Sequence, residues 1–143
     1  MSAEENKAVV RRFIEEIFVK GNVAAVDQLA AADFTPRSWP SVSPGLENLK
    51  QAVARVSASL SEVRMTIEDM IAEGDRVAVR LTSHAMPTGN FMGIPATGKA
   101  YSMAEIHIFR VAAGKVVEHW LQADYLGMMQ QLGVMPTPGQ AKG

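Results

Sequence analysis

The spacing of the apolar residues changes from helical to alternating at about residue 60, and this change limits the folds that the chain can adopt. Before this point, apolar residues recur every three to four positions, which is typical of amphipathic helices. After it, apolar and polar residues alternate, which is typical of strands with one buried face. Helices gathered at the front and strands behind them predict an α+β fold, in which antiparallel strands cover their apolar face with the early helices.

Three helices are expected in the first part of the chain, and particular residues mark their ends. Ser2 and Glu5 form a capping box, and Gly21 ends the first helix in a left-handed conformation. A short second helix follows near residues 22–29, and a third lies near residues 46–60. The segment 34–45 between them contains three prolines, which predicts a long loop with Trp39 as its apolar anchor.

Four strands are expected in the second part, at residues 63–67, 77–82, about 100–111 and 116 to about 123. Short turns join neighbouring strands at residues 73–75 and 113–114, and a Gly- and Pro-rich connection, residues 87–98, joins the middle two. A short helix at residues 126–132 ends the fold. We therefore expect one domain, residues 1–133, and a flexible C-terminal tail, residues 134–143.

Charge and composition exclude several classes of protein. The 14 Lys and Arg residues nearly balance the 15 Asp and Glu residues, whereas a nucleic-acid surface normally requires a basic excess. The chain has no cysteine, so it has no disulfide, cysteine nucleophile or thiolate zinc site. Its acidic start is unlike a secretory signal, and no apolar run approaches the ~20 residues of a membrane span. We expect a cytoplasmic protein with no nucleic-acid or membrane partner.

Glu105 and His107 are the strongest candidates for chemistry, because residues two apart on a strand share a face. On the next strand, His119 and Leu121 share a face by the same alternation, and the short turn makes the two strands neighbours. A histidine with a carboxylate in apolar surroundings is the minimum required for proton transfer near neutral pH. The alternative is that both histidines are hydrogen-bonded structural residues. The phosphate-loop and dinucleotide motifs are absent and the histidine spacing is poor for zinc, so neither cofactor nor metal is expected.

Three further residues have open interpretations. Asp124 either caps the terminal helix or supplies another carboxylate to the site. Met103 belongs to a set of methionines that either line a pliable apolar pocket or fill the core. Trp120 is out of phase with its neighbours on the strand and therefore lies on the outer face of the sheet, where it predicts a dimer contact.

The chain resembles the SnoaL-like polyketide cyclases over nearly its whole length. The resemblance rests on Val9–Phe13, Gly21-Asn22, Ala32–Phe34, Gly89–Gly98 (GNFMGIPATG), Glu105–Arg110, Gly114–Trp120 and Gln130–Gly133. It implies an NTF2-like fold, in which helices wrap a curved antiparallel sheet into a cone with a deep apolar cavity. It also implies dimerisation through the outer face of the sheet.

The resemblance further implies an intramolecular aldol condensation that closes a ring on an aromatic polyketide ester without metal or cofactor. The family's histidine corresponds to His107, and His119 and Asp124 also match its pattern. The family's acid/base aspartate falls at Leu121, which cannot transfer a proton. A glutamine of the family becomes Glu105, and an asparagine of the first long loop becomes Pro36.

The leading hypothesis is therefore an enzyme that acts on an apolar, cyclic small molecule. Its catalytic residues are His107 and Glu105, with Asp124 as a further carboxylate, and its pocket is lined by Trp39, Met103, His119 and Leu121. The first alternative is a non-catalytic protein that binds a small molecule in the same cavity. The second is a dimeric scaffold, which leaves the inward acid and histidine without a role.

Overall fold

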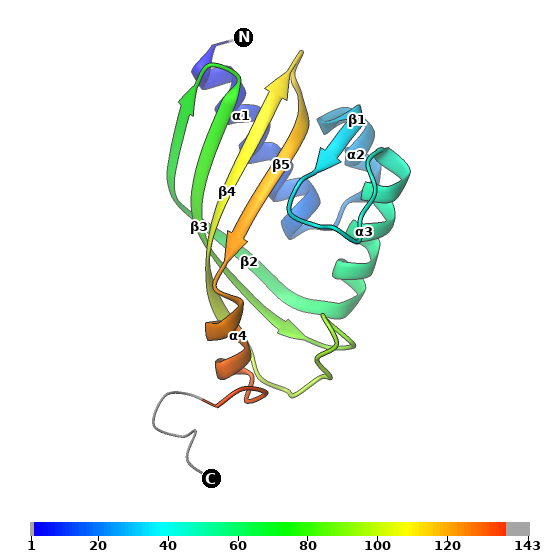
Figure 1. Cartoon of the computed structure of the whole chain (residues 1–143), viewed down its shortest axis with the longest axis vertical. Helices are drawn as coiled ribbons and strands as arrows, with labels where there is room; N and C mark the ends of the chain where they lie inside the picture. Colours follow the sequence, from blue (N-terminus) through cyan, green and yellow to red (C-terminus); the bar gives the residue numbers. More distant parts are fainter. Residues whose placement is uncertain (1, 137–143) are drawn as a thin grey trace.

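The computed structural model describes residues 2–136, which form helices packed on one curved sheet (Figure 1). The elements follow in the order α1 (Ala3–Phe13), η1 (Ile14–Val19), η2 (Val23–Ala25), α2 (Val26–Leu29), β1 (Ala30–Pro36), α3 (Leu46–Ser59), β2 (Leu60–Glu73), β3 (Arg76–Pro87), β4 (Tyr101–Ala112), β5 (Lys115–Ala123) and α4 (Tyr125–Gln131). The predicted α+β class and single layer of helices on a sheet are confirmed. Most of the predicted tail, residues 137–143, lies outside the described residues.

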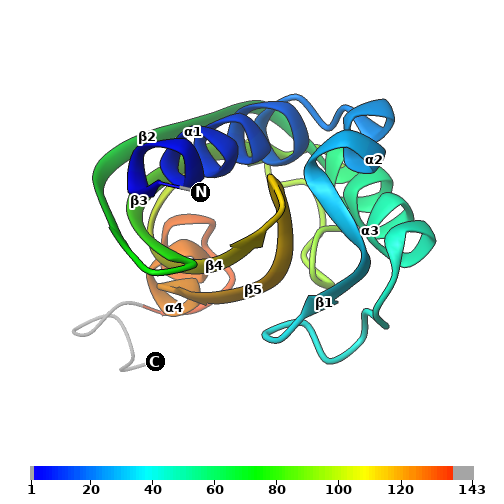
Figure 2. The same cartoon turned by 90° about the horizontal axis from the view of Figure 1, so that it is seen from above.

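The sheet has the strand order β1-β5-β4-β3-β2. Strands β2 to β5 form the predicted antiparallel meander, and a fifth strand that was not predicted, β1, runs parallel to β5 at the edge of the sheet. Residues 34–36, which the prolines placed in a loop, are the end of β1. Proline is compatible with this position because β1 lies at the edge of the sheet, where one side of the strand needs no ladder donor. Figure 2 shows the curvature of the sheet, which remains open.

Two apolar clusters fill the concave side of the sheet. The first core lies between α1, η1 and the middle of the sheet, and includes Val10, Phe13, Val79 and Phe109. The second core lies where α4 packs on β4. Its buried members are Ala85, Ile94, Tyr101, Met103, Met128 and Leu132, and its partly buried members are Leu60, Val63, Phe91, Ala123, Tyr125 and Met129.

Gly21 ends the first helical segment, as predicted, with a φ of +62°. A Cβ atom at this position would lie 2.5 Å from Ser57 Oγ of α3, so glycine also permits close approach of the two segments. We predict that Gly21→Ala lowers the free energy of unfolding by about 2–3 kcal/mol, because the left-handed conformation and the contact both oppose a side chain. Urea unfolding measures this. Gly89→Ala is the control, since a Cβ there meets nothing within 4 Å, and a Gly21→Ala loss no larger than the control's would contradict the explanation.

Candidate active site

Four polar side chains form one continuous hydrogen-bonded chain on the concave face of the sheet. Ser83 Oγ lies 2.5 Å from Glu105 Oε2, and Glu105 Oε1 lies 2.7 Å from His107 Nε2. His107 Nδ1 lies 2.8 Å from His119 Nε2. All four residues are at most 5% exposed. Buried polar groups are costly unless they are paired, and this chain pairs both oxygens of the carboxylate and both nitrogens of His107.

Strand alternation accounts for most of this arrangement. Burial on β4 alternates strictly from Tyr101 to Phe109, so Glu105 and His107 share the concave face as predicted. Leu121 on β5 is the Cα partner of His107, whereas His119 is the Cα partner of Phe109. The contact between the two histidines is therefore diagonal across the strands. A register shift between residues 110 and 111 of β4 and their β5 partners sets this alignment.

Ser83 was missed by the sequence analysis, although its place in the alternation of β3 predicts that it faces the core. It lies on β3 as the Cα partner of Met103, and it continues the buried alternation of Val77, Val79 and Leu81. A lone serine on a strand carries no chemical signature by itself. The acceptor that gives it a role, Glu105, lies on the next strand and becomes its neighbour only through the sheet register.

The hydrogen bonds place the protons next to Glu105. Ser83 Oγ–H and His107 Nε2–H both donate to its carboxylate, and His107 Nδ1 is hydrogen-bonded to His119 Nε2. Burial lowers the pKa of His119 well below its ordinary value, and the neighbouring His107 lowers this pKa further. His119 is thus a neutral imidazole at physiological pH, and its Nε2 atom is hydrogen-bonded to His107.

Aromatic rings pack around the two histidines. The ring centroids of Phe18 and Trp39 lie 5.3 Å and 5.4 Å from that of His119, and the centroid of Phe109 lies 4.8 Å from it. The segment that carries Trp39 is tied to β5, because Leu121 N–H donates to Ser38 Oγ at 2.8 Å. Trp39 therefore anchors the segment after β1, as expected, and lies beside the histidines together with half-buried Phe18.

Two of the predicted site residues are not part of the hydrogen-bonded chain of polar side chains. Asp124 is exposed, and its Oδ1 accepts a hydrogen bond from Gly127 N–H at 2.9 Å, so it caps α4. The capping interpretation thus describes its place in the structure. Met103 is 5% exposed and belongs to the second core, directly beside Ser83 in the sheet register.

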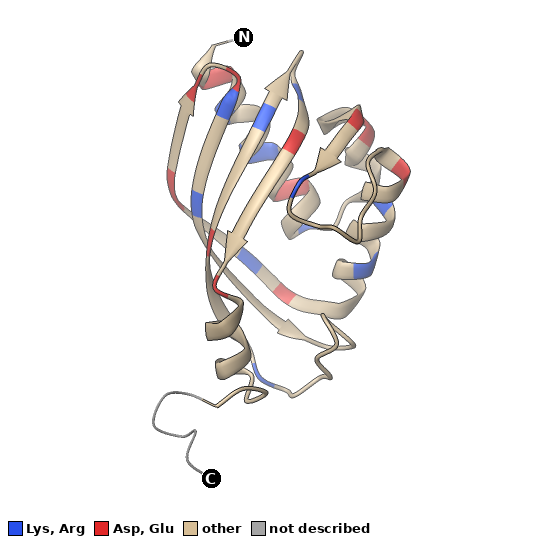
Figure 3. Ribbon diagram, viewed as in Figure 1, with Lys and Arg blue, Asp and Glu red and all other residues tan. Residues whose placement is uncertain are grey.

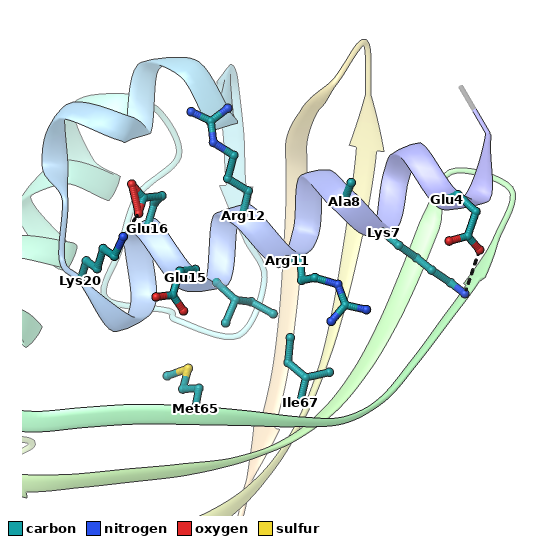
Figure 4. Close-up of a pocket in the computed structure, with 11 residues that line it drawn as sticks. Glu4, Lys7, Ala8, Arg11, Arg12, Glu15, Glu16, Lys20, Met65 and Ile67 are labelled. Carbon is teal, nitrogen blue, oxygen red and sulfur yellow. Dashed lines mark ion pairs between the residues drawn. The ribbon is translucent and has the colours of Figure 1, made fainter.

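Two pockets lie elsewhere on the described part of the chain. A groove of about 690 Å³ separates α1 and η1 from β2, with Met65 and Ile67 on its strand side (Figure 4). Two ion pairs lie among its charged residues, Lys7 with Glu4 at 3.5 Å and Lys20 with Glu16 at 2.9 Å. A second pocket, of about 470 Å³, opens at the far end of β2, β3 and β4. Neither pocket is lined by His107 or His119, so a deep cavity beside His107 stays a prediction.

The polar side chains are linked end to end and do not converge on one point. Metal ligands converge on one point with free lone pairs, whereas both nitrogens of His107 are engaged by Glu105 and His119. Within residues 2–136, no three His, Asp or Glu side chains are grouped so that they could hold a metal ion. None of the helices in this part of the chain combines the length and the apolar character needed to span a membrane.

This combination of helices on the concave face of a curved, open sheet defines an NTF2-like fold. The structure of TsrD from Streptomyces laurentii superposes with a TM-score of 0.85 at 26% sequence identity, covering 94% of this chain and 99% of that one. The family model for SnoaL-like polyketide cyclases matches residues 8–132. The chain belongs to the SnoaL-like polyketide cyclase family.

Curated relatives of the chain are named as cyclases. The aklanonic acid methyl ester cyclase DnrD of Streptomyces peucetius is 41% identical over 66 residues, which are 46% of this chain and 46% of the relative. The alignment with this relative thus spans less than half of its length. The aklanonic acid methyl ester cyclase AcmA of Streptomyces galilaeus is 30% identical over 131 residues, 90% of this chain and 91% of the relative.

Proposed function

We propose that the protein catalyses cofactor-free proton transfer on an apolar, cyclic small molecule that carries a carbonyl group, with intramolecular aldol cyclisation as the family's form of this reaction. The observation that carries the proposal is the buried chain of Ser83, Glu105, His107 and His119. A carboxylate and two imidazoles in an apolar wall have the residue types and the contacts that general acid–base catalysis requires.

In this proposal Glu105 is the base. It takes a proton from the carbon next to the ligand's carbonyl group, the C–H electron pair moves into the enolate, and the enolate carbon bonds to a second carbonyl carbon. The resulting alkoxide takes up the proton that Glu105 accepted, so the reaction consumes no cofactor. His107 Nε2 lies 2.7 Å from Glu105 Oε1 and orients the carboxylate, and neutral His119 orients the ring of His107 through its bond to Nδ1.

The position of the carboxylate differs from the family pattern. The resemblance places the family's aspartate at Leu121, the Cα partner of His107 on β5, whereas here the carboxylate lies two residues from His107 on β4. A base at Glu105 approaches a ligand from another direction than one at residue 121. We therefore expect the native protein to be slow in the cyclisation of polyketide methyl esters, while retaining proton transfer as such.

A binding protein without catalysis is the second candidate, and one observation favours it. The rings of Phe18, Trp39 and Phe109 pack directly on His119. They shield the hydrogen-bonded polar side chains from a ligand. The deciding experiment measures turnover and binding on the same samples. Purified protein is incubated with an aromatic polyketide methyl ester, and product is followed by chromatography with mass detection. Tight binding with no proton transfer supports the binding protein, whereas turnover above the uncatalysed rate supports the enzyme.

We also propose that two copies associate through the outer face of the sheet. Ile71, Ala78, Ile108 and Trp120 are successive Cα partners across β2, β3, β4 and β5, and they form one apolar row on this face. Ile71 is 67% exposed. Most of β4 and β5 carries no charge in Figure 3, and nearby charges pair within the chain, as Arg80 does with Asp69. With a net charge of −1 per copy, the electrostatic repulsion between two copies is small.

The assembly is tested by sedimentation at micromolar concentration. We predict a species of twice the chain mass of 15.5 kDa, and dissociation on Ile108→Lys, because a charge in the apolar row must lose its hydration in the contact. Ser102→Lys, on the same face of β4 but outside the row, is the control and should leave the dimer intact. A native protein that sediments as a monomer overturns the proposal.

A further inference from the structure

Aromatic side chains separate the histidines of the candidate site from a ligand. His107 and His119 are each 1% exposed. The rings of Phe18 and Trp39 pack on His119 with centroid separations of 5.3 Å and 5.4 Å, and both of these residues are half-buried. A ligand that approaches His119 from this side must therefore displace one of the two rings.

Phe18 is the more firmly held of the two. It lies in η1, where Lys20 N–H donates to the Glu15 carbonyl oxygen at 3.1 Å, which is the bond of a π-helical turn. Its ring packs edge to face on Phe13, at 5.3 Å, and Phe13 is fully buried in the first core. Such π-helical turns are rare in general and occur often at functional sites. We therefore assign Phe18 to the fixed wall of the site.

Trp39, in contrast, belongs to a weakly held segment, residues 39–43, between β1 and α3 (Figure 1). Within residues 2–136, none of residues 39–43 makes a hydrogen bond to a helix or a strand, and Val42 N–H donates to the Trp39 carbonyl oxygen inside the segment. Pro40 has no N–H group to donate. Segments with few hydrogen bonds open locally at low free-energy cost, so the packing of the Trp39 ring is what holds this segment closed.

The chain on both sides of this segment is fixed to the rest of the fold. Ser38 Oγ accepts a hydrogen bond from Leu121 N–H of β5 at 2.8 Å. The Pro44 carbonyl oxygen accepts one from the Asn48 side chain of α3 at 2.9 Å. Movement of residues 39–43 about these two points withdraws the indole ring and leaves the sheet unchanged, as the hinged loops that cover active sites do.

The space that the indole ring occupies defines the class of ligand. The plane of this ring makes an angle of 54° with Phe18 and of 71° with His119. Aromatic rings attract one another in such tilted and edge-to-face arrangements. A flat ring system of two fused rings has the size and shape of indole, so it can make the same contacts once Trp39 has moved away.

We propose that residues 39–43 are a lid, and that a flat aromatic ring system of the ligand takes the place of the Trp39 indole against Phe18 and His119. Opening of the lid uncovers the His119 end of the hydrogen-bonded polar side chains. The inference rests on the proposed function only where it assigns turnover to the ligand that binds there.

The main test is Trp39→Ala, because a lid and a binding wall respond in opposite directions. Removal of a ring that stacks on the ligand weakens binding, whereas removal of a ring that occupies the ligand's place strengthens it. The probes are 2-naphthol, which is flat, and 2-decalol, which has the same carbon skeleton but is puckered. With an open form populated at about 1–10%, Trp39→Ala should strengthen 2-naphthol binding by about ten- to a hundredfold. The gain for 2-decalol should be smaller, because a puckered ring is thicker than indole. Ligand-observed NMR measures both dissociation constants.

A second variant loosens the lid and keeps the indole. Ser38→Ala removes one hydrogen bond to β5, and it should strengthen 2-naphthol binding by about two- to tenfold, the usual effect of one neutral hydrogen bond. Its control is Ser61→Ala, which removes a hydrogen bond to the Met86 carbonyl oxygen between β2 and β3. The control for Trp39→Ala is Phe91→Ala, which removes another half-buried ring, in the second core. Both controls should leave 2-naphthol binding unchanged.

A spectroscopic measurement follows the lid in the native protein. The chain has two tryptophans, Trp39 and Trp120, and incorporation of 5-fluorotryptophan gives each a fluorine NMR signal, assigned with Trp120→Phe. When 2-naphthol binds, the difference in the Trp39 shift between H₂O and D₂O should increase, because the indole ring moves into water. The Trp120 signal should stay unchanged.

Three results would each overturn the lid. They are weaker 2-naphthol binding by Trp39→Ala, a Trp39 signal that becomes more buried on binding, and no binding of 2-naphthol to either protein. Because 2-naphthol does not undergo aldol cyclisation, none of these results depends on turnover. A lid that opens as expected in a protein without proton transfer leaves this inference intact and refutes the proposed function instead, so the two failures are distinguishable.

Discussion

Glu105→Gln should lower the rate of proton abstraction by about 10²–10⁴-fold, the range that a positioned general base contributes. The amide has nearly the shape of the carboxylate but cannot accept a proton. Its NH₂ group is also a donor, and next to His107 Nε2 or Ser83 Oγ it opposes the existing direction of the hydrogen bonds. The measurement is the exchange of the acidic C–H hydrogens of 2-tetralone with D₂O, followed by proton NMR with native and variant protein.

The matched control is Glu73→Gln, the same chemical change at an exposed position at the end of β2. It should leave the exchange rate unchanged, which excludes a general effect of the lost charge. A Glu105→Gln protein that folds and exchanges hydrogen as fast as the native protein shows that Glu105 is not the base. In that case the hydrogen-bonded chain has a structural role, as the alternative interpretation of the histidines holds.

The fold was largely predictable where the pattern is local. Strict alternation from Tyr101 to Phe109 identifies a strand and its buried face without any knowledge of its neighbours. The parallel pairing of β1 with β5 was not predictable in this way, because it joins Thr35 to Glu118, which are far apart in the sequence. Pro36 favoured a loop, because proline fits a strand only at the edge of a sheet. No residue near Pro36 in the sequence shows that its strand is an edge strand.

The candidate site, like the fold, was predictable only where it depends on local spacing in the sequence. Glu105 and His107 share a face because of a two-residue spacing, and this is visible in the sequence. The contact of His107 with His119 depends on the register shift near residue 111, which only the folded sheet reveals. Ser83 has no chemical signature of its own. It becomes a candidate when the structure shows that its hydroxyl group donates to Glu105.

Leu121→Asp should raise the cyclisation of an aromatic polyketide methyl ester, which we expect the native protein to perform poorly. The substitution restores a carboxylate at the position where the resemblance places the family's acid/base aspartate. Leu121 is the Cα partner of His107, so the new group lies beside the histidine that the family pattern requires. Because a positioned acid/base group contributes about 10²–10⁴-fold, even partial recovery is measurable against the native background.

The substitution also has a cost, which provides a second test. Leu121 is half-buried, and a polar group in its place loses part of its hydration, so we expect a loss of about 1–3 kcal/mol in the free energy of unfolding.

Leu121→Asn is the control, because it has the shape of aspartate and a similar cost but no group that can transfer a proton. If both variants lose stability and only Leu121→Asp gains activity, the missing carboxylate explains the slow native reaction. If neither turns over while both bind an apolar ligand tightly, the cavity binds without catalysis. High native activity that disappears in Glu105→Gln means instead that the acid/base role lies on β4, where Glu105 already contacts His107.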